Sequence, residues 1–146
     1  MTEAEKWAWI QDLEDKYLKG GIMLSEWSTM LAKEADHAFC SGANLAAVLA
    51  AQAAMEAHLR YDFFDPENVK GWGFYKLIEG ADDVSEDLRE RMHEVRRFRN
   101  TWVHVNDPHD DEHLLERPEL VEAEAEVITM KALDAMMDLF CTYQWV

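Results

Sequence analysis

The stretch ANLAAVLAAQAAMEAHLR, Ala43 to Arg60, decides the expected fold. Its larger side chains recur every three or four residues, which is the spacing of one face of an α-helix. Many positions between them are alanine, whose small side chain lets neighbouring helices approach closely. We therefore predict that this segment is the central helix of a bundle. The side chains expected on its inner face are Leu45, Val48, Leu49, Gln52, Met55, Glu56 and Leu59.

Helical spacing also extends through most of the chain on both sides of this stretch. Thr2 and Glu5 form a capping-box pattern at the start of a first helix, and Pro118 stands where a long last helix is expected to begin. A second helix starts near Ser25, a short one covers 74–79, and another runs from about 83–85 to Asp107-Pro108. The apolar side chains expected on the inner side of the second helix are Trp27, Leu31, Ala35, Ala38 and Phe39.

The length and the patterning favour one domain of one structural class. A chain of 146 residues is long enough to bury one substantial core. The sequence has no strand pattern of any length, no internal repeat and no low-complexity linker. We therefore predict a single all-α domain over residues 1–146, folded as an up-down bundle of four to five main helices.

Composition narrows the environment in which the protein acts. The chain has no apolar run near the roughly 20 residues that a membrane span needs, and its acidic, amphipathic beginning does not resemble a signal peptide. Cys40 and Cys141 lack the spacing of metal ligands, so two free thiols are expected. We therefore expect a cytoplasmic protein that has no membrane partner.

The charge is uneven along the chain. The sequence carries 30 acidic against 14 basic residues, a net charge of −16, which disfavours an extended nucleic-acid footprint. Yet RERMHEVRRFR, Arg89 to Arg99, holds five of the 14 basic residues. If this protein meets a phosphate, these arginines are the expected contact, with Arg96 and Arg97 as candidate RNA-binding residues. The alternative is a solvated helix face whose arginines pair with nearby carboxylates.

Three residue types capable of phosphodiester chemistry follow each other here. Arg96, Asn100 and His104 step four residues at a time and share one helix face, whereas Arg99 lies to the side of it. Arginine holds phosphate oxygens, histidine transfers protons near neutral pH, and asparagine both donates and accepts hydrogen bonds.

The segment RNTWVH, Arg99 to His104, resembles the signature of HEPN domains, in which an arginine and a polar residue precede a histidine. The alanine-rich stretch is similar to the helix that comes before the signature helix in that family. We place the resemblance over about residues 25–140. It implies an all-helical domain that forms a homodimer with its signature helices facing each other.

The resemblance also implies an activity. Many HEPN domains are endoribonucleases that need no metal or other cofactor, and some act as toxins or in defence. By position, Arg99 would contact the scissile phosphate of single-stranded RNA, His104 would transfer a proton, and Asn100 would orient the reacting groups. The 2′-hydroxyl of the RNA would attack, leaving a cyclic phosphate.

The sequence also leaves open the identity of a protein partner, a function without catalysis, and a metal site in one loop. Toxins of this family that are paired with a modifying antitoxin commonly carry a tyrosine two residues after the histidine, where this chain has Asn106. This difference argues against an antitoxin that modifies tyrosine, whereas another antitoxin or protein partner stays open. A non-catalytic module that binds a nucleotide or a protein partner through its arginines is the alternative function. HDDEH, 109–113, has metal-ligand residue types, but a solvated loop is the preferred interpretation.

Overall fold

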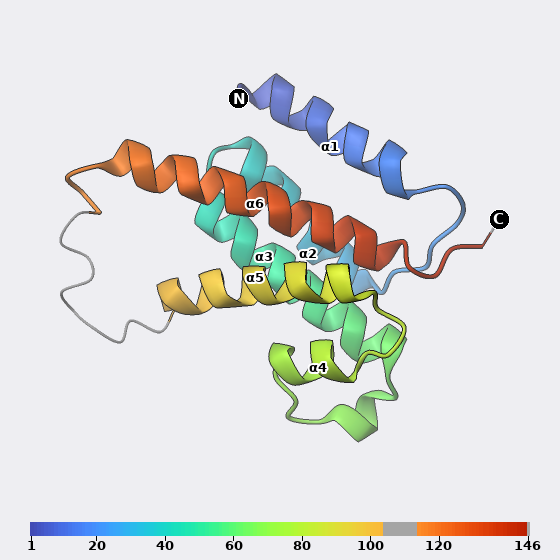
Figure 1. The fold of residues 1–146 in the computed structure, drawn as a ribbon. Coiled ribbons are helices and arrows are strands. Elements are labelled where there is room, and N and C mark those ends of the chain that lie inside the picture. The colour runs from blue at the N-terminus through green and yellow to red at the C-terminus, as the bar shows by residue number, and fades with distance from the viewer. Residues whose placement is uncertain (104–113, 146) are drawn as a thin grey trace.

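The computed structural model describes residues 1–103 and 114–145. Within these ranges the extended backbone pairing is a single bridge between Gly21 and Trp145. The prediction of an all-α bundle is therefore confirmed. The six α-helices are α1 (Glu3–Tyr17), α2 (Glu26–Cys40), α3 (Asn44–His58), α4 (Phe74–Gly80), α5 (Glu86–Val103) and α6 (Pro118–Phe140) (Figure 1). A π-helical turn, Leu59–Phe63, and a 3₁₀ turn, Pro66–Val69, connect α3 to α4.

The starts of α1, α2 and α6 follow the signals in the sequence, whereas the predicted end of α5 at Asp107-Pro108 lies outside the described residues. The Glu5 amide donates to Thr2 Oγ1 over 3.2 Å, and the Thr2 amide donates to the Glu5 carboxylate over 2.6 Å, which completes the capping box. Ser25 accepts from the Ser28 amide at the start of α2, and Pro118 is the first residue of α6. The contacts of Thr2 and Ser25 satisfy backbone N–H groups that the start of a helix leaves without a partner. Proline has no backbone N–H, so Pro118 leaves no such group unpaired at the start of α6.

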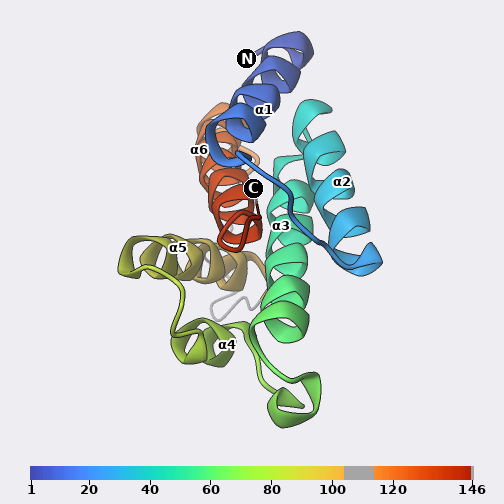
Figure 2. The same cartoon turned by 90° about the vertical axis from the view of Figure 1, so that its right-hand side faces the viewer.

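The alanine-rich helix α3 is central, as predicted. It packs against α2 on one side and against α6 and α5 on the other (Figure 2). Ala47, Ala51 and Ala54 are fully buried, so the close approach of the neighbouring helices rests on these small side chains. Packing at this density leaves little room for a larger residue at those positions.

Two large side chains predicted to face the core are exposed instead. Leu49 of α3 is 37% exposed, because the buried face of α3 is centred on Ala47, Ala51 and Met55 and Leu49 lies on nearly the opposite side of the helix. Trp27 of α2 is 69% exposed, because α2 turns Ala35 and Phe39 toward α3 and leaves its first turn uncovered on that side among the described residues.

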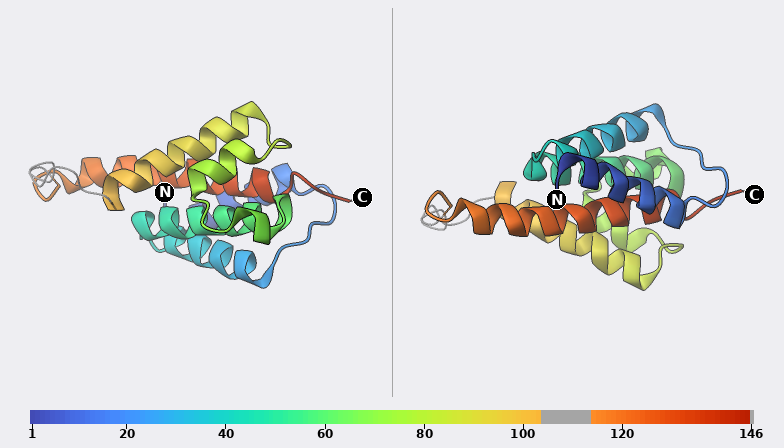
Figure 3. Two further views of the ribbon diagram at one scale, coloured as in Figure 1. Left: turned by 90° about the horizontal axis from the view of Figure 1, so that it is seen from below. Right: turned by 90° about the horizontal axis from the view of Figure 1, so that it is seen from above.

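The ends of α5 and α6 that flank the undescribed residues lie at one end of the molecule. The first turns of α6 project beyond the other helices there (Figure 3). At the opposite end, residues 143–145 return to the α1–α2 connection, where Trp145 bridges Gly21. No helix within the described ranges is both long and apolar enough to cross a lipid bilayer.

Candidate functional site

The orientation of α5 is set by its apolar side chains. Leu88, Met92 and Val95 are buried in the core, and Phe98 packs partly against it. Ser85 accepts the Leu88 amide over 3.1 Å at the start of the helix. This arrangement places the arginines of α5 along the flanks of the helix, where each meets different neighbours.

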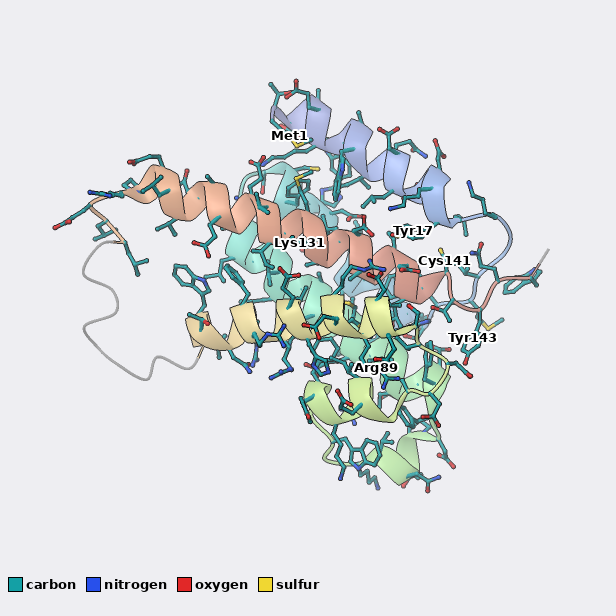
Figure 4. All side chains as sticks on the ribbon, viewed as in Figure 1. Met1, Tyr17, Arg89, Lys131, Cys141 and Tyr143 are labelled. Carbon is teal, nitrogen blue, oxygen red and sulfur yellow. The ribbon has the colours of Figure 1, made fainter. Side chains whose placement is uncertain are left out.

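Arg89 and Arg91, the first two arginines of α5, contact neighbouring segments of the bundle. Arg91 forms ion pairs with Asp87 of its own helix at 2.9 Å and with Asp134 of α6 at 3.1 Å, and it also contacts Asp138. Arg89 lies on the side of α5 that faces α4, where it donates to the Ala81 carbonyl over 3.0 Å (Figure 4). The charges of Arg89 and Arg91 are therefore engaged in contacts that hold α5 against α6 and the end of α4.

Arg96 is held by a buried histidine. Its Nε donates to His93 Nδ1 over 3.2 Å, and His93 Nε2 lies 2.7 Å from a Glu79 carboxylate oxygen on α4. Acceptance at Nδ1 places the ring proton on Nε2, where it faces Glu79. The Arg96 guanidinium also lies 5.0 Å from the ring centre of Tyr75, a cation–π distance. The guanidinium plane of Arg96 is thus fixed from two sides.

His93 received no role from the sequence. Its partner Glu79 is 14 residues away on another helix, so no local spacing connects the two. The one sequence signal was the three-residue step from His93 to Arg96, which puts both on one side of a helix.

Arg97 is exposed and forms an ion pair with Glu90 of the same helix. It donates to Glu90 over 2.6 Å, and this contact lowers the pKa of the Glu90 carboxyl. Exposed ion pairs of this kind contribute little free energy, so the contact between Arg97 and Glu90 opens readily.

Arg99 and Asn100 form the part of the predicted catalytic set that the structure describes. Both are half-buried near the end of α5, and Arg99 Nη1 donates to Asn100 Oδ1 over 3.4 Å. Unlike Arg89, Arg91 and Arg97, Arg99 has no carboxylate partner in the part of the chain that the structure describes. His104, the third predicted catalytic residue, lies outside the described residues, as do Asn106 and the HDDEH segment.

The described residues contain no group of three His, Cys, Asp or Glu side chains that is placed to hold a metal ion. Cys40 and Cys141 are both buried as free thiols.

Comparisons with models of known protein families, with curated proteins and with solved structures give no match. The resemblance to HEPN domains therefore rests on the RNTWVH signature and on the alanine-rich helix α3.

Proposed function

We propose that this protein is a metal-independent endoribonuclease of the HEPN type that acts as a homodimer on single-stranded RNA. The observation that carries the proposal is Arg99. It is an arginine without a carboxylate partner among the described residues, in a chain of 30 acidic residues, and it contacts the asparagine of the signature. An arginine left unpaired in such an acidic protein has its charge available for an external anion.

The chemistry follows from the three signature residues. The hydrogen bond to Asn100 uses one N–H of Arg99 and leaves the others for the non-bridging oxygens of a phosphodiester. The 2′-hydroxyl of the RNA loses its proton and attacks the phosphorus, and the bond to the 5′-oxygen breaks as that oxygen gains a proton. His104 serves in this proton transfer. The products are a 2′,3′-cyclic phosphate and a 5′-hydroxyl. Arg99 stabilises the charge that builds on the phosphate during this step.

Arg96 supplies a second contact in this proposal. The acceptor Nδ1 of His93 and the ring of Tyr75 hold its guanidinium in one orientation. A guanidinium that is fixed before binding loses less side-chain entropy when it meets a phosphate or stacks on a base. Glu79 and His93 are thus positioning residues, which act through Arg96 and do not touch the substrate.

The dimer is supported by apolar side chains near the site. Val103 at the end of α5 is 43% exposed, and Leu120 and Val127 of α6 are each 56% exposed. Leu120 and Val127 are seven residues apart and therefore share one face of α6. A second copy packed by two-fold symmetry on this end of the molecule would bring two signature helices together.

The test is an RNA-cleavage assay on the wild type and on Arg99→Ala and His104→Ala. Loss of Arg99 should slow cleavage about 10²–10³-fold, and loss of His104 about 10²–10⁴-fold, without unfolding the protein. Lys70→Ala removes a positive charge from an exposed ion pair in the loop between α3 and α4 and should leave the rate unchanged. Wild-type products should carry cyclic phosphates and should form equally in the presence of EDTA.

The alternative is a non-catalytic module that binds a nucleotide or a protein partner through Arg96, Arg97 and Arg99. The net charge of −16 favours it, because repulsion from the body of the protein weakens binding to RNA. If wild type and His104→Ala degrade RNA at the same rate, the cleavage comes from a contaminant and this second function replaces the first.

A further inference from the structure

A largely apolar groove of about 350 Å³ lies between α1, α2 and the C-terminal part of α6. Figure 3 shows these three helices as neighbours on the side of the bundle away from α4. Its accessible apolar lining comes from Trp7 and Leu18 of α1, from Ile22 and Leu24 of the α1–α2 connection, and from Met137 of α6. Met136 and Phe140 of α6 also border the groove but are almost fully buried. The volume is within the range of small-molecule sites, which are typically lined by apolar side chains with a few polar groups among them.

One carboxyl in this groove has no partner. Asp36 of α2 is half-buried, and it makes no hydrogen bond or ion pair within the described residues. Burial, with a smaller contribution from the Glu14 carboxylate across the groove, raises the pKa of Asp36 to about 7. A carboxylate in apolar surroundings is costly unless a cation or a hydrogen-bond donor satisfies it.

The other charged groups of the groove do not satisfy Asp36. Glu14 faces it from α1 with like charge, and Lys33 and His37 line the groove from α2 itself. Lys33 forms no ion pair with Asp36, although the two are three residues apart, and His37 packs edge-on against Trp7. The described lining residues of α6 are apolar. An external cation is therefore the group that this site lacks.

We propose that the groove binds a small amphipathic ammonium ion. The ammonium group donates to the Asp36 carboxylate, and the apolar body lies against Ile22, Leu24 and Met137. The charge-assisted hydrogen bond offsets the desolvation of the carboxylate, and the flexible Met137 side chain adapts to the shape of the apolar body. The exposed ring of Trp7 offers a second contact for a cation at the rim of the groove. This site is separate from α5 and does not depend on the proposed ribonuclease activity.

Binding should depend on pH in a defined direction. The cation favours ionised Asp36, so its affinity should rise as the pH increases through about 7 and then level off. The variant Asp36→Asn tests this dependence, because it removes the ionisable carboxyl and keeps the rest of the groove.

The experiment is a calorimetric titration of the whole protein with n-octylamine at pH 6 and pH 8. Asp36→Asn should weaken binding at pH 8 about tenfold or more and should remove most of the pH dependence. Glu34→Gln, which makes the same charge change at an exposed position of α2, should bind like the wild type. Octanoate and 1-octanol, with a similar apolar chain and no cation, should bind much more weakly.

Three results would overturn the proposal. The first is equal binding of n-octylamine by wild type and Asp36→Asn. The second is equal binding of n-octylamine and 1-octanol by the wild type. The third is no binding of n-octylamine at millimolar concentration. Circular dichroism of each variant verifies that the helices are intact.

Discussion

A half-buried carboxyl without a donor, such as that of Asp36, makes the stability of the fold depend on pH. Its pKa is about 7 in the folded protein and about 3.9 in an unfolded chain. Folding therefore favours the protonated form. The contribution to stability is complete below about pH 4 and is lost as the pH rises through 7.

Asp36→Asn should accordingly raise the free energy of unfolding at pH 8 by about 1–2 kcal/mol, less than the full linkage value because the carboxyl keeps part of its contact with water. At pH 5 the wild-type carboxyl is already protonated in the fold, so the difference should be smaller. Urea unfolding at both pH values measures it. Glu34→Gln, made at an exposed position, should show no comparable pH-dependent difference. A gain for Asp36→Asn that is equal at both pH values would contradict this explanation.

The types of residue in the candidate site were predictable from the sequence, but their partners were not. The resemblance of RNTWVH to the HEPN signature names Arg99, Asn100 and His104 as candidate residues. Whether an arginine is neutralised depends on side chains that the fold brings from elsewhere. Asp134 and Asp138 reach Arg91 from 43 and 47 residues away, and Glu79 reaches His93 from 14. Local periodicity contains no information about such contacts.

For the helices, the sequence predicted the residue at which each of α1 and α2 begins better than it predicted which side of a helix is buried. The contacts of Thr2 and Ser25 with the first turns of α1 and α2 join residues three apart, so the sequence alone is sufficient to indicate them. Which side of a helix is buried depends on the neighbours that cover it. Trp27 and Leu49 were assigned to the core by size and spacing, and both are exposed because no described helix covers their side.

Gln144 joins the last helix to the connection between α1 and α2. Its Oε1 accepts from the amides of Lys19 and Gly20 at 2.7 and 3.0 Å, and its Nε2 donates to the carbonyls of Tyr17 and Cys141 at 2.8 and 2.9 Å. One side chain thus satisfies four backbone groups on two segments. This contact fixes the end of α1 against the end of α6.

Gln144→Ala should therefore lower the free energy of unfolding by about 1–3 kcal/mol, because partly buried backbone groups lose their partner. Thermal unfolding followed by circular dichroism measures the loss. Gln11→Ala is the matched control. Gln11 hydrogen-bonds to exposed carboxylates of its own helix at 3.3 and 3.4 Å, and its removal should change stability by less than about 0.5 kcal/mol. Similar losses for the two variants would show that the Gln144 contacts contribute little.

For the whole molecule, the charge and the proposed activity impose opposite requirements. A net charge of −16 repels RNA, whereas cleavage needs RNA beside Arg99. Two copies joined at the end of α5 would place their arginines in one cleft, where the positive charges add locally. The two acidic copies repel each other when they associate. Salt screens this repulsion, so the dimer should become more stable as the ionic strength rises. Activity and assembly are therefore coupled in the proposed function.

This coupling is tested by placing acidic residues on the exposed apolar side chains of α6. Leu120→Glu combined with Val127→Glu should convert a dimer into a monomer in sedimentation experiments, because four carboxylates would meet across a two-fold interface. Both side chains are more than half exposed, so the helical content should not change. RNA cleavage should fall with the dimer, since a composite site needs both copies.

The matched control is Trp27→Glu combined with Met30→Glu, which adds the same two charges to exposed apolar side chains of α2. This variant should remain a dimer and should cleave RNA at the wild-type rate. Dissociation of the control alone would place the interface on α2, away from Arg99, and would remove the argument for a site shared between copies. A wild type that sediments as a monomer at micromolar concentration yet cleaves RNA would have the same consequence, because each chain would then need to bring Arg99, Asn100 and His104 together without a partner.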